Sequence, residues 1–179
     1  AVYREADGLR SIGALAATVP EPLGSELRTA AAAYARASAA EWTELARRRE
    51  APEVLARADA LLALLAAPAV AEAAGTNVQA LLLRKASDIR ADHDLRVALS
   101  QTHVNPLKWL GMAFLGFLTL VSVAMAHLER PRAAFAAVLL FALAAAPTAA
   151  IVLIQGNPFQ QPSSVTAAPI TAVAKALER

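Results

Sequence analysis

Two apolar stretches decide the fold: LKWLGMAFLGFLTLVSVAMA at residues 107–126 and AAFAAVLLFALAAAPTAAIVLI at residues 133–154. The first contains one charge, Lys108 near its start, and the second contains none. A helix of about 20 residues covers about 30 Å, which is the thickness of the hydrocarbon core of a bilayer. The short polar connector at 127–132 allows the two helices to run antiparallel. The pattern predicts a hairpin of two membrane-spanning helices.

The alternative for these stretches is a buried helical hairpin inside a soluble protein. Such a hairpin needs other helices on every side, and the rest of the chain is too short and too amphipathic to supply them. Composition agrees with the membrane interpretation, because the 179 residues are 57% hydrophobic with a mean hydropathy of +0.43. Alanine, the commonest residue, favours helix, and no stretch alternates steadily between apolar and polar residues. The predicted fold class is an all-α membrane protein.

The residues before the hairpin are predicted to form a mostly helical region. Apolar residues recur at helical spacing over about 1–18, 23–49, from Pro52 onward and over 78–102, with proline or glycine turns between them. Lys and Arg are more numerous on the outer flanks of the two spans than in the connector, which places both chain ends in the cytoplasm. We expect a bacterial inner-membrane protein with three parts: a cytoplasmic helical region at 1–105, the transmembrane hairpin at 106–155 and a cytoplasmic tail at 156–179.

One group of polar residues invites a metal-site interpretation. Asp88 and Asp92 are four residues apart, and His93 and Asp94 lie beside them. Hard divalent cations prefer clustered carboxylates, so a cation site is one interpretation. The favoured one is a solvated helix face whose acids pair with basic neighbours: Arg84, Lys85, Arg90 and Arg96. His103 and His127, which flank the first span, are interpreted as polar caps.

The sequence lacks the residues that several classes of function require. There is no cysteine for a disulfide, a thiolate metal site or a nucleophile. The three consecutive arginines at 47–49 have no aromatic or further basic residues beside them, so we expect no nucleic-acid binding. Phosphate loops, zinc motifs and catalytic triads are missing, which predicts a protein that is not an enzyme and has neither a cofactor nor a metal. Ionisable residues are missing from the spans beyond Lys108, which argues against a transporter core.

Several landmarks follow one another in a definite order along the chain. They are Glu5 before Ala6, Trp42 after Glu41, Arg96 before Val97, Pro106 and Trp109 at the first span, and Pro158 with Phe159 after the second. In order and spacing they resemble the bacterial bestrophin-like domain family, membrane proteins of unknown function. The resemblance covers nearly the whole chain. The chain departs from the family pattern at Asn157 and Gln161, which stand where the family usually has an acid and a glycine.

The resemblance implies a function and a set of partners. It suggests an oligomeric ion channel, with anions as the ions, and further membrane spans upstream of Ala1. The alternative is a non-catalytic accessory or scaffolding subunit of a larger membrane complex. The expected partners are the lipid bilayer and either copies of the chain or other membrane subunits. The landmarks are expected to be structural and not ligands, with Pro106, Trp109, Pro158 and Phe159 forming one cluster that joins the helical region to the spans.

Overall fold

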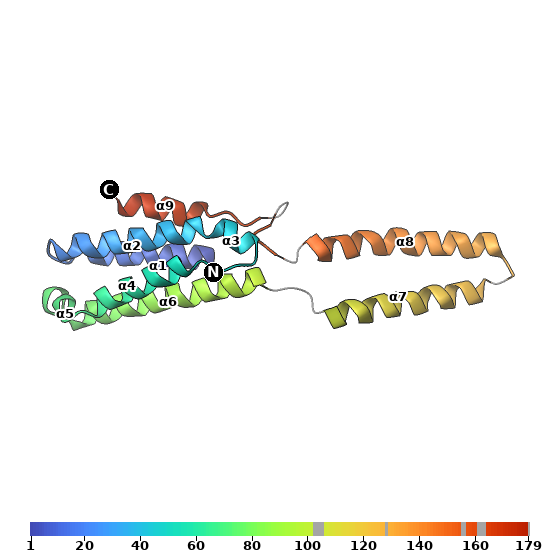
Figure 1. Cartoon of the computed structure of the whole chain (residues 1–179), viewed down its shortest axis with the longest axis horizontal. Helices are drawn as coiled ribbons and strands as arrows, with labels where there is room; N and C mark the ends of the chain where they lie inside the picture. The colour runs from blue at the N-terminus through green and yellow to red at the C-terminus, as the bar shows by residue number, and fades with distance from the viewer. Residues whose placement is uncertain (102–105, 128, 155–156, 161–163, 179) are drawn as a thin grey trace. The chain divides into compact units, whose positions relative to one another are not determined.

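A computed structural model describes residues 1–101, 106–127, 129–154, 157–160 and 164–178. The regular elements of this part are all α-helices, which confirms the predicted fold class (Figure 1). They are α1 (Val2–Ala16), α2 (Leu23–Ala40), α3 (Trp42–Ala46), α4 (Pro52–Ala66), α5 (Pro68–Ala74), α6 (Thr76–Gln101), α7 (Pro106–Ala126), α8 (Pro131–Ile154) and α9 (Ala168–Leu177).

The helices form two compact units. The first, called here the helical unit, consists of Ala1–Gln101 together with Pro158–Arg179, and the second, the hairpin unit, is Thr102–Asn157. The chain therefore leaves the helical unit after α6 and returns to it after α8. The returning segment is not a free tail, because α9 packs against α1 and α2.

The core of the helical unit is built from stripes of apolar residues on the facing sides of its helices. α1 packs against α6, and α2 packs against α4 and α9. At the α1–α6 contact a Cβ on Gly8 would lie 2.7 Å from Cγ1 of Ile89, so glycine permits the close approach of the two helices. The largest apolar side chains of the core, all almost fully buried, are Leu9, Ile12, Leu27, Leu45, Leu61, Leu65, Leu82 and Ile170.

The structure divides the helix that the sequence predicted over 23–49. α2 ends at Ala40, α3 ends at Ala46, and Arg48 adopts a left-handed backbone with φ of 61°. The chain then turns back, and the backbone N–H of Ala51 donates to the Glu41 carboxylate at 3.1 Å. This long-range bond is satisfied only when the helix stops short of residue 49, which explains the difference.

The hairpin unit consists of α7 and α8, which pack against each other. Within them, Leu107–Ala126 and Pro131–Ile151 have mean hydropathies of 2.0 and 2.2, and both are long enough to cross a membrane. Their large apolar side chains are exposed, including those of Phe114, Phe117 and Phe135. Exposed rings at this density fit a lipid environment and not water. These are the features of a transmembrane hairpin.

The bent pair α4 and α5 also passes the length and hydropathy test, with an angle of 55° between the two helices. Its apolar face is already used, because Val54, Leu61 and Leu65 are buried in the core of the helical unit. The opposite face carries exposed charges at Arg57 and Asp59. The pair is therefore part of the helical unit, and α7 and α8 remain the spans.

Single cysteines test the placement of the spans, because the chain has no cysteine of its own. We expect Phe117→Cys and Ala142→Cys to react poorly with a water-soluble maleimide in proteoliposomes, since the hydrocarbon core excludes the reagent. Arg57→Cys, on the exposed face of α4, should react fully once the vesicles are opened with detergent. Rapid labelling of positions 117 and 142 in intact bilayers would contradict the hairpin.

Candidate functional site

The most unusual feature of the helical unit is a buried cluster of charged residues centred on Arg96 of α6. The Arg96 side chain has no exposed surface. Its Nη1 donates to Glu5 Oε2 at 2.6 Å and its Nη2 donates to Glu41 Oε2 at 2.8 Å. Both carboxylates are also fully enclosed. One guanidinium therefore holds α1 and the α2–α3 junction against α6.

Two hydroxyl groups of α2 complete the surroundings of Glu5. Tyr34 Oη donates to Glu5 Oε1 at 2.8 Å, and Ser38 Oγ donates to the same oxygen at 2.7 Å. Ser38 Oγ also accepts a bond from Arg96 Nη1 at 2.9 Å. Burial, together with the charge of Glu5, raises the pKa of the Tyr34 hydroxyl, so it stays neutral and keeps its proton for this bond.

Glu41 has a separate set of partners. Its Oε2 lies 3.1 Å from Nε2 of His93, a residue of α6 that is itself buried. Burial alone would raise the pKa of the Glu41 carboxyl. The hydrogen bonds from His93 and from the backbone N–H of Ala51 act in the opposite direction, as do the nearby positive charges, and the pKa of Glu41 is lowered overall. Glu41 is therefore held in its charged form.

Trp42 joins this cluster to the segment that returns from the hairpin. Its ring lies 4.8 Å from Arg96 Cζ, within the range of a cation–π interaction. Phe159 meets the same ring edge-on, with centroids 5.6 Å apart and an interplanar angle of 86°. Trp42 Nε1 donates to the carbonyl oxygen of Val165 at 2.7 Å, and Gln160 Nε2 donates to that of Ala46 at 2.7 Å. Phe159, Gln160 and Val165 are thus held against Trp42 and Ala46 of α3.

The structure brings four of the seven predicted landmarks into one place: Glu5, Trp42, Arg96 and Phe159. Pro158 is half-buried beside Phe159, and its carbonyl accepts from the N–H of Val165 at 2.8 Å. The other two landmarks, Pro106 and Trp109, belong to α7 in the hairpin unit. Their predicted contact with Pro158 and Phe159 stays a prediction.

Other predicted details fall at the edges of the described segments. His127 Nδ1 lies 2.9 Å from the carbonyl oxygen of Val123 at the end of α7. His103, which was also interpreted as a cap, lies outside the described residues, as does Gln161.

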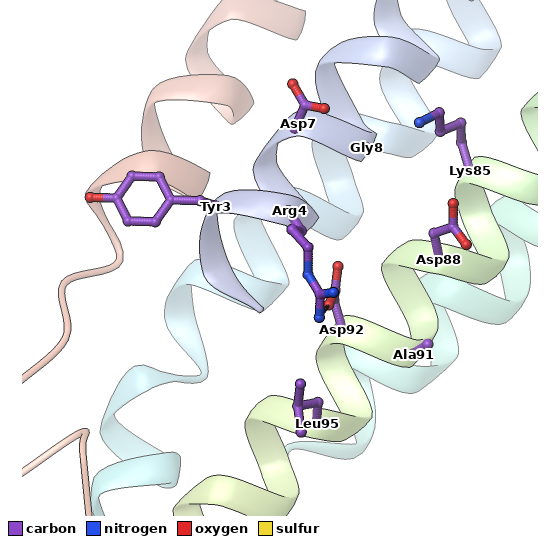
Figure 2. Close-up of a pocket in the computed structure, with 9 residues that line it drawn as sticks. All are labelled: Tyr3, Arg4, Asp7, Gly8, Lys85, Asp88, Ala91, Asp92 and Leu95. Carbon is purple, nitrogen blue, oxygen red and sulfur yellow. Dashed lines mark hydrogen bonds and ion pairs between the residues drawn. The ribbon is translucent and has the colours of Figure 1, made fainter.

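The acids that suggested a cation site are divided among different partners. Asp92 pairs with Arg4 of α1 at 2.6 Å, while His93 turns inward to Glu41. Arg4 and Asp92 line an open groove of about 760 Å³ between α1 and α6. Figure 2 shows Arg4 reaching toward Asp92, with Lys85 and Asp88 farther along α6. Over the described ranges, no three His, Asp or Glu side chains gather closely enough to hold a metal ion. The expectation of a solvated face is wrong for Asp92 and Arg96, because both are buried. Asp92 pairs with Arg4 of α1, and Arg96 pairs with Glu5 and Glu41 and not with the acids of its own helix.

Sequence reasoning missed the roles of Tyr34, Ser38, Glu41 and His93. The sequence did contain a signal that these polar residues are buried, because they continue the apolar stripes of their helices at the same spacing. Tyr34 and Ser38 of α2, and Glu41 directly after it, extend the stripe that begins at Leu27 and Ala31. The same holds for Glu5 between Val2 and Leu9 in α1, and for His93 and Arg96 after Leu82, Ala86 and Ile89 in α6. Opposite charges in the stripes of different helices indicate that they meet in the core.

The fold and the cluster define an all-helical protein in which a helical unit with a charged core is continuous with an apolar hairpin. The Bestrophin-like domain family matches residues 1–170, which include both units. The chain belongs to the Bestrophin-like domain family, as its landmarks indicated. No curated protein and no solved structure matches the chain.

Removing the Arg96 guanidinium should be severely destabilising. We expect Arg96→Met to lower the free energy of unfolding by about 3–5 kcal/mol, because it leaves two buried carboxylates without a cation. Arg90→Met is the matched control, since Arg90 is on the same helix and pairs with Asp59 at the surface, where such pairs contribute about 0–1 kcal/mol. Denaturant unfolding followed by circular dichroism measures both. Adding Glu5→Gln to Arg96→Met should recover part of the loss.

The lowered pKa of Glu41 predicts a specific dependence on acid. The stability that Glu41 contributes is complete above the ordinary glutamate pKa of 4.5 and is lost as the pH falls through the lowered value. Glu41→Gln should therefore be less stable than the parent at neutral pH, and the difference should shrink as the pH falls from about 5 toward 2. Glu53→Gln, at an exposed pair with Arg57, should show no such convergence. A constant gap between parent and Glu41→Gln would contradict the assignment.

Proposed function

We propose that the chain is part of an oligomeric, non-catalytic ion channel of the bestrophin-like type that conducts anions. The observation that carries the proposal is the family match over residues 1–170, which extends through both apolar helices. α7 and α8 contain no Asp or Glu, and their two charges, Lys108 and Arg132, are positive and lie near the helix starts. Cation pores are commonly lined by acidic rings, so spans without acids favour anions.

The exposed side chains of the hairpin unit support an assembly of several copies. Two helices alone do not enclose a pore, and the windows Leu107–Ala126 and Pro131–Ile151 have no buried residue. A continuous pathway therefore requires further helices beside α7 and α8, and the proposal takes them from several copies of the protein, with lipid covering the remaining faces. The proposed setting is a bacterial inner membrane, with residues 1–105 and the C-terminus in the cytoplasm.

An accessory or scaffolding subunit is the second candidate, and the surface of α6 favours it. Leu81, Leu95 and Leu99 are each 42–43% exposed. Their spacing places them on one face of the helix. Leu95 and Leu99, one turn apart, give an exposed apolar spot outside the spans that another protein can cover. In this role the hairpin anchors the helical unit and conducts nothing.

Planar-bilayer recording of the purified full-length protein distinguishes the two candidates. A channel predicts currents that reverse near the chloride equilibrium potential in an asymmetric KCl gradient, together with a defined oligomer by mass photometry. Reversal near the potassium potential would contradict anion conduction. Silent bilayers containing a folded protein would contradict the channel and leave the accessory role.

A further inference from the structure

The exposed large apolar side chains of the helical unit gather on two of its helices. In the described part of this unit they are Tyr3 of α1, Leu81, Leu95 and Leu99 of α6, and Val165. The large apolar side chains of α2 and α4 are instead packed in or against the core. Leu95 and Leu99 are one turn apart and form a single apolar spot, and Leu95 also lines the open groove between α1 and α6.

The charged residues of this groove have both signs. Arg4 and Asp92 pair with each other across it. The remaining three are Asp7 of α1 with Lys85 and Asp88 of α6 (Figure 2). Among the described residues these three form no ion pair, although a cation and two acids lie on neighbouring helices. Their charges are therefore available to a partner that carries both signs.

The form and charge of the groove restrict the kind of partner that fits. A small molecule is normally enclosed over about 70–90% of its surface, and an open groove does not enclose it in this way. Asp7 and Asp88 repel nucleic acids and anionic lipid headgroups. Acyl chains would bury the unpaired charges without a partner. A protein surface with an apolar spot and charges of both signs remains.

We propose that the partner is a second copy of this chain, bound through the same surface. We call this surface the α1–α6 face and define it by Asp7, Lys85, Asp88, Leu95 and Leu99. In a two-fold contact each pairing occurs twice, so Lys85 of each copy meets an acid of the other. The two apolar spots cover each other beside these pairs. A partner of a single sign would leave either the lysine or the acids facing a like charge, which is unfavourable.

This inference rests on the oligomeric part of the proposed function and is independent of conduction. The proposed function requires several copies, and the α1–α6 face supplies a contact between them outside the spans. It also gives to a second copy the spot at Leu95 and Leu99 that an accessory role would give to another protein. The alternation of charge on the face favours copies of the same chain over surfaces of one sign.

Disulfide cross-linking of the full-length protein in its membranes tests the face, because the chain has no cysteine of its own. We expect Leu95→Cys and Leu99→Cys each to form a disulfide-linked dimer when copper phenanthroline is added. Arg57→Cys is the matched control, since it is an exposed position on α4 outside the face. It should remain monomeric on a non-reducing gel under the same conditions.

Reversing charges tests whether the partner is a copy of the same face. In the Leu95→Cys background, Lys85→Glu makes the face acidic and Asp88→Lys makes it basic. Each variant expressed alone should give about fivefold less dimer, because like charges then meet in place of exposed ion pairs. When the two variants are co-expressed with different tags, the mixed dimer should recover, because the two faces are again opposite in sign.

Each contrary result has a definite meaning. If positions 95 and 99 form no disulfide in a protein that mass photometry shows to be oligomeric, the face is wrong and the proposed oligomer stands. A monomeric protein would overturn both. Cross-linking of position 95 to a different protein, dimer yields that charge reversal leaves unchanged, or mixed dimers that do not recover would each overturn the assignment of a second copy.

Discussion

The guanidinium of Arg96 is the point at which three distant stretches of the chain are held together. It bonds Glu5 in α1 and Glu41 between α2 and α3, at 2.6 and 2.8 Å. A buried cation that loses a partner is costly, because water cannot replace the missing bond. The helices around Arg96 can therefore close only in the register that satisfies both carboxylates. The apolar packing of Leu9, Leu27 and their neighbours follows from that register.

We interpret this charged cluster as selecting how the helices pack, and not as a net source of stability. Well-packed apolar residues in its place are often as stable or more so. Alanine-rich helices, however, present smooth and similar surfaces, and many packings of α1, α2 and α6 would bury similar areas. Buried charges must pair with opposite charges, so only the packing that brings Glu5 and Glu41 to Arg96 is favourable. We interpret Glu5, Glu41 and Arg96 as serving this purpose, with Trp42 extending the selection to the segment that follows α8.

Apolar residues follow opposite rules in the two units. In the helical unit they form narrow stripes that point inward, and the charges at the same depth are paired with one another. In α7 and α8 apolar residues occupy all sides and are exposed. Water as the solvent requires the first pattern, and hydrocarbon permits the second. Along the sequence, the first pattern gives way to the second between α6 and α7, and it resumes after α8.

The sequence alone determined the class of helices and the position of the hairpin, because length, absence of charge and helical periodicity are local properties of residues 107–126 and 133–154. Family landmarks such as Glu5 and Arg96 were also visible in it. Only the tertiary structure decided that Glu5, Trp42, Arg96 and Phe159 form one cluster, that His93 faces Glu41, and that α9 packs against α1 and α2. The reason is physical: periodicity indicates which side of a helix is buried, whereas the partner of a buried charge is chosen among residues some ninety positions away.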